Sequence, residues 1–158
     1  MVDDAVTSRR TVLKGAAAAL GTWLVAGVLA PLRALAAEWS KPAFESRKVE
    51  DALQNLFGTA QATPSASIRI VAPYQAENGA TVRFEVSTTL PNASTIAVLV
   101  EKNPAPLVMA MHVRGAQPYV SLRLKMAESS DVHAIVKSQG KLYSAKQNIK
   151  VTVGGCGG

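Results

Sequence analysis

The segment Thr81-Val82-Arg83-Phe84-Glu85-Val86-Ser87 alternates apolar and polar side chains with a period of two. Its three apolar side chains fall on one face of an extended chain, and Arg83 and Glu85 fall on the other. This alternation is typical of a β-strand with one face in a core and the other toward solvent. The segment therefore predicts a half-buried strand at residues 81–87.

Further strand patterns lie on both sides of this segment. They cover residues 68–71, 96–100, 107–113, 120–126, 132–137 and 143–153. Two patterns place an apolar residue at every second position, with Leu107, Met109, Met111 and Val113 in one strand and Ile149, Val151 and Val153 in the other. Turn residues separate the strands, at 77–79, 91–92, 103–106, 115–118 and 138–141. About seven strands with no helix between them predict an antiparallel β-sandwich of immunoglobulin-like type.

A single helix is expected before the first strand, over residues 41–57. Ser40 is a suitable capping residue, and Pro42 is tolerated in the first turn of a helix. Apolar residues then follow helical spacing, at Val49, Ala52, Leu53, Leu56 and Phe57. Gly58 is a natural stop at the C-terminal end of the helix.

Composition predicts a globular protein with one domain. The chain has 158 residues, of which 48% are hydrophobic and 18% are charged. The formal charge of +6 includes Arg9, Arg10, Lys14 and Arg33 near the start. After residue 36, 13 basic and 9 acidic residues remain, which gives 13 − 9 = +4. The charges are spread along the chain, so we expect a mildly basic surface and no nucleic-acid footprint.

The first 36 residues have the pattern of an export signal. Ser8-Arg9-Arg10-Thr11-Val12-Leu13-Lys14 resembles the twin-arginine motif, with Val12 in place of the usual Phe. An apolar run and the small-residue pattern Ala34-Leu35-Ala36 follow, so we expect cleavage after Ala36. An uncleaved membrane anchor is the alternative, but the apolar run is marginal for a span. The pattern predicts a periplasmic protein, exported by the twin-arginine pathway, without stable membrane anchoring.

The one cysteine of the chain, Cys156, lies in the tail Gly154-Gly155-Cys156-Gly157-Gly158. A single thiol cannot form an internal disulfide, and in an exported protein it indicates intermolecular pairing or a reactive group. Glycine is costly to order, so we expect residues 154–158 to form a mobile arm on a domain of residues 37–153. Five extended residues reach about 17 Å. The alternative is a disordered tail with an incidental cysteine.

The rest of the sequence contains no recognisable catalytic or metal-binding pattern. His112 and His133 lie within strand patterns and lack a second ligand at metal-site spacing, so we expect no metal and no catalytic residues. A mobile arm supplies no fixed cation or helix end to lower the ordinary cysteine pKa of about 8.5. We therefore expect Cys156 to be activated inside client enzymes.

The glycine-flanked Cys156, the twin-arginine leader and the helix-then-sandwich layout together resemble the SoxY family of sulfur carriers of bacterial thiosulfate oxidation. The resemblance implies that Cys156 carries the sulfur adducts and that no separate cofactor is bound. It also implies a heterodimer with a SoxZ-like subunit. The clients that it implies are a c-type haem enzyme that couples thiosulfate, a dimanganese hydrolase that releases sulfate and, where present, a sulfane dehydrogenase.

Other functions remain open from the sequence. The chain could be an exported interaction domain that dimerises through a Cys156 disulfide. A ubiquitin-like thiocarboxylate carrier would use the terminal Gly157-Gly158, although the export signal argues against a cytoplasmic activation system. An enzyme is disfavoured because acid, base and metal-ligating residues do not converge in the sequence.

Overall fold

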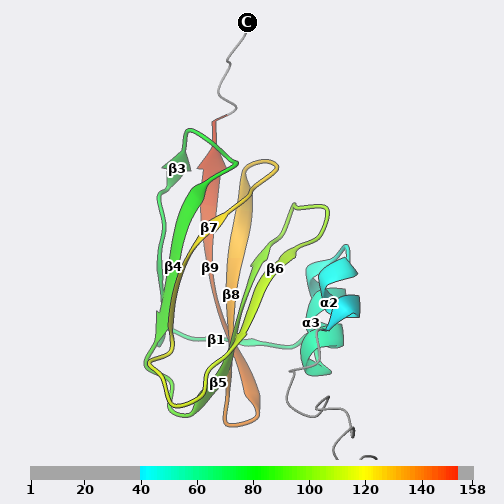
Figure 1. The fold of residues 1–158 in the computed structure, drawn as a ribbon, viewed down its shortest axis with the longest axis vertical. Coiled ribbons are helices and arrows are strands. Elements are labelled where there is room, and N and C mark those ends of the chain that lie inside the picture. The colour runs from blue at the N-terminus through cyan, green and yellow to red at the C-terminus, as the bar shows by residue number, and fades with distance from the viewer. Residues whose placement is uncertain (1–39, 153–158) are drawn as a thin grey trace, which may run out of the picture. The chain divides into compact units, whose positions relative to one another are not determined.

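The computed structural model describes residues 40–152, which form two packed β-sheets preceded by two short helices (Figure 1). The predicted fold class, a mainly β sandwich with helical structure before the strands, is confirmed. The predicted signal segment and the glycine-rich arm lie outside the described residues. The helices are α2 (Lys41–Glu45) and α3 (Val49–Phe57). The strands are β1 (Thr63–Pro64), β2 (Ile68–Val71), β3 (Gln75–Ala76), β4 (Val82–Thr88), β5 (Ala93–Val100), β6 (Leu107–His112), β7 (Tyr119–Leu124), β8 (Ser130–Ser138) and β9 (Lys141–Val151).

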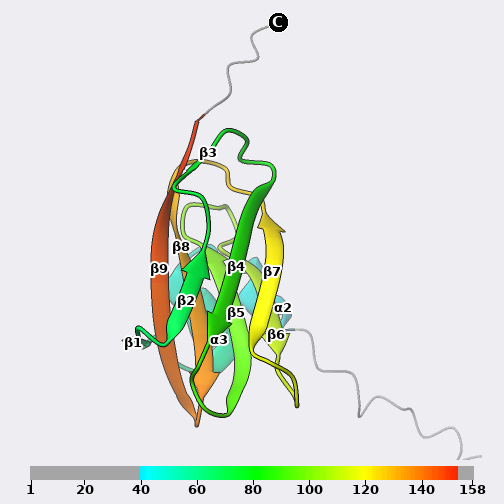
Figure 2. The same cartoon turned by 90° about the vertical axis from the view of Figure 1, so that its left-hand side faces the viewer.

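The larger sheet has six strands and the smaller has three. The larger has the order β1-β9-β8-β5-β6, with β3 also paired to β9, and the smaller has the order β2-β4-β7. Figure 2 shows the small sheet in front of the large one. The seven longer strands pair antiparallel, as predicted. The two-residue strands β1 and β3 were not predicted, and both pair parallel to β9.

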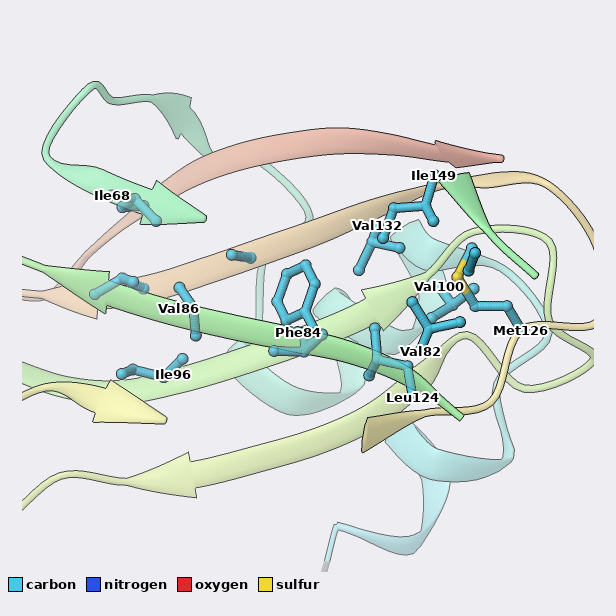
Figure 3. Packing of buried hydrophobic residues seen from close by; sticks show 14 residues of the cluster. Ile68, Val82, Phe84, Val86, Ile96, Val100, Leu124, Met126, Val132 and Ile149 are labelled. Atoms are coloured by element: carbon cyan, nitrogen blue, oxygen red, sulfur yellow. The ribbon is translucent and has the colours of Figure 1, made fainter. Parts of the chain in front are cut away.

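The core between the sheets is built from the residues that alternate inward. Phe84 is fully buried at its centre, and Val82 and Val86 flank it on β4, as the alternation predicts. Figure 3 shows these side chains facing Ile96 and Val132 of the large sheet. Each fully buried aliphatic or aromatic side chain contributes roughly 1.5–3 kcal/mol to the stability of the fold. This layer can therefore hold the two sheets together without a disulfide.

A second core lies between the helices and the outer face of the large sheet. Ala52 and Leu53 of α3 pack there with Ala97 and Leu99 of β5. Strand β5 is therefore buried on both faces, because Ile96, Val98 and Val100 point into the core between the sheets. This explains why its sequence is a nearly continuous apolar run.

The prediction of one continuous helix over residues 41–57 is wrong. Ser46 ends α2 in an extended conformation, and its hydroxyl donates to the Pro42 carbonyl at 2.8 Å. The Asn55 amide of α3 in turn donates to the Ser46 hydroxyl at 3.1 Å. Serine competes with the helix through such hydrogen bonds, so the chain turns and α3 folds back along α2.

The expected helix ends are only partly confirmed. Pro42 lies in the first turn of α2, and Gly58 ends α3 in the left-handed conformation with φ 79°. Ser40 occupies the capping position of α2, but its side chain makes no capping hydrogen bond. Its hydroxyl donates instead to the Asn55 carbonyl, at 3.4 Å.

The predicted alternation over residues 107–113 is interrupted by a β-bulge. Val98 pairs with Met109 but Leu99 pairs with Leu107, so Val108 is an extra residue in β6. A bulge moves the preceding side chain to the opposite face. Leu107 therefore packs under the helices, while Met109 faces the core between the sheets.

The hairpin between β8 and β9 agrees with the turn predicted at residues 138–141. Gln139 and Gly140 both have positive φ angles, 49° and 77°. Two such residues form the tight turn whose twist matches a β-hairpin. No helix within residues 40–152 has the length and apolarity needed to cross a membrane.

Candidate functional site

The predicted site residues lie outside residues 40–152. These are Cys156, the neighbouring Gly154, Gly155, Gly157 and Gly158, and the export-signal residues Arg9 and Arg10. The structure does describe the point from which the chain continues toward Cys156. Strand β9 ends at Val151, and Thr152 is the last described residue, four positions before the thiol.

Strand β3 holds the end of β9 by parallel pairing. The Lys150 amide donates to the Tyr74 carbonyl at 2.9 Å, and the Thr152 amide donates to the Ala76 carbonyl at 3.0 Å. The Thr152 hydroxyl also donates to the Ala76 carbonyl, at 3.3 Å. Figure 1 shows β3 beside the end of β9. These hydrogen bonds hold Lys150 and Thr152 against the segment that contains β3.

Ser129 fixes the same end of β9 from its other side. Its hydroxyl accepts a hydrogen bond from the Val151 amide at 2.9 Å and donates to the Val151 carbonyl at 3.3 Å. The pairing of β8 with β9 ends at Ser130 and Ile149, so no β8 residue pairs with Val151. The Ser129 hydroxyl therefore satisfies both the amide and the carbonyl of Val151 on this side.

Gly79 brings a third segment against the end of β9. Its carbonyl accepts a hydrogen bond from the Met126 amide at 2.7 Å. A Cβ atom on Gly79 would lie 2.5 Å from the Met126 carbonyl oxygen and 3.0 Å from Val151 Cγ1. Glycine is required here by close approach rather than by a positive φ angle.

Asn103 ties the remaining loop to this end. Its amide nitrogen donates to the Lys125 carbonyl at 2.8 Å, and its amide oxygen accepts from the Ala127 amide at 3.0 Å. The Lys102 amide donates to the Ser130 hydroxyl at 3.0 Å. We call the tied segments, residues 74–79, 101–103, 125–130 and 150–152, the exit platform.

A charged network lies on the outer face of the large sheet beside the exit platform. Asp131 accepts hydrogen bonds from Asn148 Nδ2 at 2.7 Å and from Lys146 Nζ at 2.9 Å. The hydrogen bonds from Asn148 and Lys146 hold the pKa of Asp131 below its ordinary value. The hydrogen bond to Asp131 raises the pKa of the exposed Lys146.

Both histidines lie on this outer face of the large sheet. His133 Nε2 is 3.1 Å from a Glu101 carboxylate oxygen, and His112 Nδ1 is 3.2 Å from the Thr95 hydroxyl. Within residues 40–152, no group of three or more His, Cys, Asp or Glu side chains could hold a metal ion. No buried side-chain nitrogen or oxygen in this part of the chain lacks a hydrogen-bond partner.

Sequence reasoning did not identify the exit platform. Residues 77–79 and 103–106 were predicted as turns, which is correct but leaves their partners unknown. The Asn-Gly pair at 78–79 and the Asn-Pro pair at 103–104 are visible turn signals. The contacts that tie them together join residues 22 to 76 positions apart, and one sequence does not show such pairs.

Comparison with known proteins identifies one family model and, among the matching solved structures, a sulfur carrier with the same fold. The family model for sulfur oxidation protein SoxY matches residues 53–156. The sulfur carrier protein SoxY from Chlorobium limicola f. thiosulfatophilum shares 38% sequence identity and superimposes with a TM-score of 0.62. That alignment covers 67% of this chain and 97% of the Chlorobium chain. No curated protein matches.

Two other solved structures resemble the chain only weakly. An engineered protein is 8% identical, with a TM-score of 0.40 over 56% of this chain and 21% of its own. The lytic polysaccharide monooxygenase of Jonesia denitrificans is 14% identical, with a TM-score of 0.34 over 58% of each chain. Neither likeness carries a functional conclusion.

Proposed function

The chain belongs to the SoxY family of sulfur oxidation proteins, and from this membership we propose that it carries sulfur covalently on the thiol of Cys156. One observation carries the proposal: the family match runs through the sandwich and ends at Cys156, the one thiol of the chain. The exit platform supports it, because it fixes the backbone up to Thr152. Four residues beyond it span at most about 14 Å, enough to enter a partner's active site.

The proposed loading step joins two sulfur atoms. The Cys156 thiolate and thiosulfate form a disulfide-type bond, R–S⁻ + S2O3²⁻ → R–S–S–SO3⁻ + 2 e⁻. A c-type haem enzyme accepts the two electrons. Such a bond suits a carrier because it survives transfer between enzymes and later exchanges at sulfur.

The proposed unloading step is a hydrolysis. Water attacks the terminal sulfonate sulfur, R–S–S–SO3⁻ + H2O → R–S–S⁻ + SO4²⁻ + 2 H⁺, and a dimanganese hydrolase supplies the catalysis. A sulfane dehydrogenase, where present, oxidises the sulfur that stays on Cys156. The carrier contributes the thiol and its presentation, and catalysis belongs to the client enzymes.

We place these steps in the periplasm, with a SoxZ-like subunit as the stable partner. The twin-arginine pattern at Ser8 to Lys14 supports export of the folded chain. Export also separates the carrier from cytoplasmic reductants, which would cleave a bond between two sulfur atoms.

Intact-mass analysis of protein purified from its own periplasm tests the proposal. During growth on thiosulfate we expect thiosulfonate-sized adducts that dithiothreitol removes, and a Cys156→Ser strain should neither carry adducts nor oxidise thiosulfate. Full thiosulfate oxidation in the Cys156→Ser strain would exclude the proposed role. A population that is entirely disulfide-linked dimer and free of adducts would favour an interaction domain instead.

A further inference from the structure

The outward face of the small sheet has the composition of a protein-binding surface. Strand alternation and the pairing register place eight side chains on this face, which we call the arginine face: Arg69, Val71, Arg83, Glu85, Ser87, Tyr119, Ser121 and Arg123. Three arginines and one glutamate give it a charge of 3 − 1 = +2. Figure 2 shows this sheet toward the viewer, with no described element over it.

Two of the exposed apolar side chains of the described residues lie on the arginine face. The described chain has three exposed large hydrophobic residues, Val71 at 49%, Tyr74 at 64% and Tyr119 at 50% exposure. Val71 and Tyr119 belong to the arginine face, whereas Tyr74 lies three residues after the end of β2, where Lys150 Nζ is 5.1 Å from the centroid of its ring. A hollow at Val71 is also lined by Ala72, Pro73, Arg83 and Glu85. Val71 and Tyr119 lie on the two edge strands with β4 between them, so the arginine face is mainly polar with one exposed apolar side chain at each edge.

The choice of arginine over lysine also distinguishes this face. Three of the five arginines among residues 40–152 lie on it, and it has no lysine. The long strands β8 and β9 of the large sheet instead carry lysines, at Lys137, Lys141, Lys146 and Lys150. Arginine and tyrosine are enriched at protein interfaces, and lysine is depleted there. Arginine differs from lysine because its planar guanidinium binds carboxylates in a defined geometry.

Two arginines of this face are paired unfavourably in the isolated domain. Arg83 and Arg123 are directly opposite each other on β4 and β7. Glu85 binds Arg83 Nη2 at 2.7 Å and also accepts a hydrogen bond from the Tyr119 hydroxyl at 3.2 Å. Arg123 has no carboxylate within ion-pair distance in the described part of the chain. Like charges at directly opposed positions destabilise a sheet, so an anionic partner would relieve this pair.

The arginine pair lies at the end of the sandwich from which the chain leads to Cys156. Arg83 is the second residue of β4, and Arg123 is the last but one of β7. The segments just beyond them meet at the Gly79–Met126 hydrogen bond, and Gly79 also borders Val151. A protein that binds the arginine face at Arg83 and Arg123 would therefore lie next to the exit platform.

We propose that the arginine face is the docking surface for the acidic surface of a client enzyme that takes up the Cys156 segment. The inference rests on the proposed carrier function. A second copy of this chain is disfavoured, because it would bring two +2 faces together. The exposed arginines of this face fit a short-lived complex whose formation depends on charge, which suits a carrier that must visit several enzymes.

Charge reversal at Arg123 tests the docking surface. The assay uses the loaded carrier, purified with its partner subunit, and measures sulfate release by the hydrolase against carrier concentration. We expect Arg123→Glu to raise KM about ten-fold at low ionic strength with kcat retained, and the effect to shrink at high salt. Lys141→Glu makes the same charge change at the β8–β9 hairpin and should alter KM less than about two-fold.

Protein stability separates docking from unfolding in this test. Arg123→Glu places a carboxylate opposite Arg83, so its melting temperature should equal or exceed that of the wild type while KM rises. Equal KM values for Arg123→Glu and Lys141→Glu, or a loss that salt does not change, would overturn the docking surface. Stronger binding of wild type than of Arg123→Glu to anionic vesicles, with equal hydrolase kinetics, would assign the face to lipid instead.

Mass analysis of the loaded proteins separates the two proposals. If wild-type carrier takes no adduct on Cys156, the proposed function fails whatever the arginine face does. If wild type and Arg123→Glu load equally and react with equal KM, only the docking surface fails.

Discussion

Replacing Gly79 with alanine tests whether close packing at the exit platform fixes the end of β9. The new Cβ atom would lie 2.5 Å from the Met126 carbonyl oxygen. Carbon and oxygen atoms in close C–H···O contacts are about 3.3 Å apart, so the two segments must separate by roughly 0.8 Å. That movement stretches the 2.7 Å hydrogen bond from the Met126 amide to the Gly79 carbonyl.

The expected loss of stability follows from this overlap. Overpacking costs about 1–3 kcal/mol, and the backbone carbonyl cannot turn aside as a side chain would, so we expect about 2 kcal/mol. One kcal/mol lowers the melting temperature of a domain of this size by about 4 °C, which predicts a decrease of about 8 °C. The Val151 and Thr152 amides should also exchange with solvent faster, because Gly79 borders Val151.

Thermal unfolding and amide exchange measure the two effects, and a double variant identifies the clashing atom. Val151→Ala removes Cγ1, which would be 3.0 Å from the new Cβ, but leaves the Met126 carbonyl in place. Combined with Gly79→Ala, it should therefore recover only a small part of the lost stability. A wild-type melting temperature for Gly79→Ala, or full recovery in the double variant, would refute the carbonyl clash.

Two further predictions concern side-chain networks. Hydrogen bonds from Asn148 and Lys146 lower the pKa of Asp131, so this carboxylate stabilises the fold above its unfolded pKa and the contribution is lost as pH falls through the folded value. Between pH 7 and pH 2, the melting temperature of Asp131→Asn should thus fall by less than that of the wild type. Equal decreases would contradict the stabilising role of the Asp131 carboxylate. Ser46→Ala removes the acceptor for the Asn55 amide and should cost about 0.5–1.5 kcal/mol in chemical denaturation, whereas an unchanged midpoint would show that the α2–α3 turn does not need this hydroxyl.

Strands with strong local patterns could be predicted from the sequence. Val82, Phe84 and Val86 must share a face in any extended chain, and all three are buried. The Gln139-Gly140 turn is likewise local, because glycine readily adopts the left-handed conformation there. In these places neighbouring residues alone determine the backbone.

Features that depend on distant partners could not be predicted. The break at Ser46 depends on Asn55 of the next helix, and the bulge at Val108 depends on the pairing of β6 with β5. Strand β3 exists only because β9 lies beside it, since two residues carry no periodic pattern of their own. Propensity and periodicity are properties of short segments and omit such contacts.

The candidate site also has a part that the sequence reveals and parts that depend on distant contacts. Cys156 could be identified from composition alone, as one thiol among glycines, and its role stays a prediction that the described residues do not test. The exit platform and the arginine face could not be identified, because each combines three or more strands or loops. The alternation of Arg83 and Glu85 indicated an outward face, but the opposition of Arg83 to Arg123 required the pairing of β4 with β7.

The length of the β8–β9 ladder has a mechanical consequence. Nine register pairs join the two strands, from Ser130 opposite Ile149 to Ser138 opposite Lys141. If a partner holds the thiol and drifts away, tension runs along the axis of β9, and the antiparallel ladder bears it in shear. A shear load is shared among many hydrogen bonds at once, whereas a peeling load breaks them singly. The sandwich can therefore act as a firm anchor while the two proteins separate.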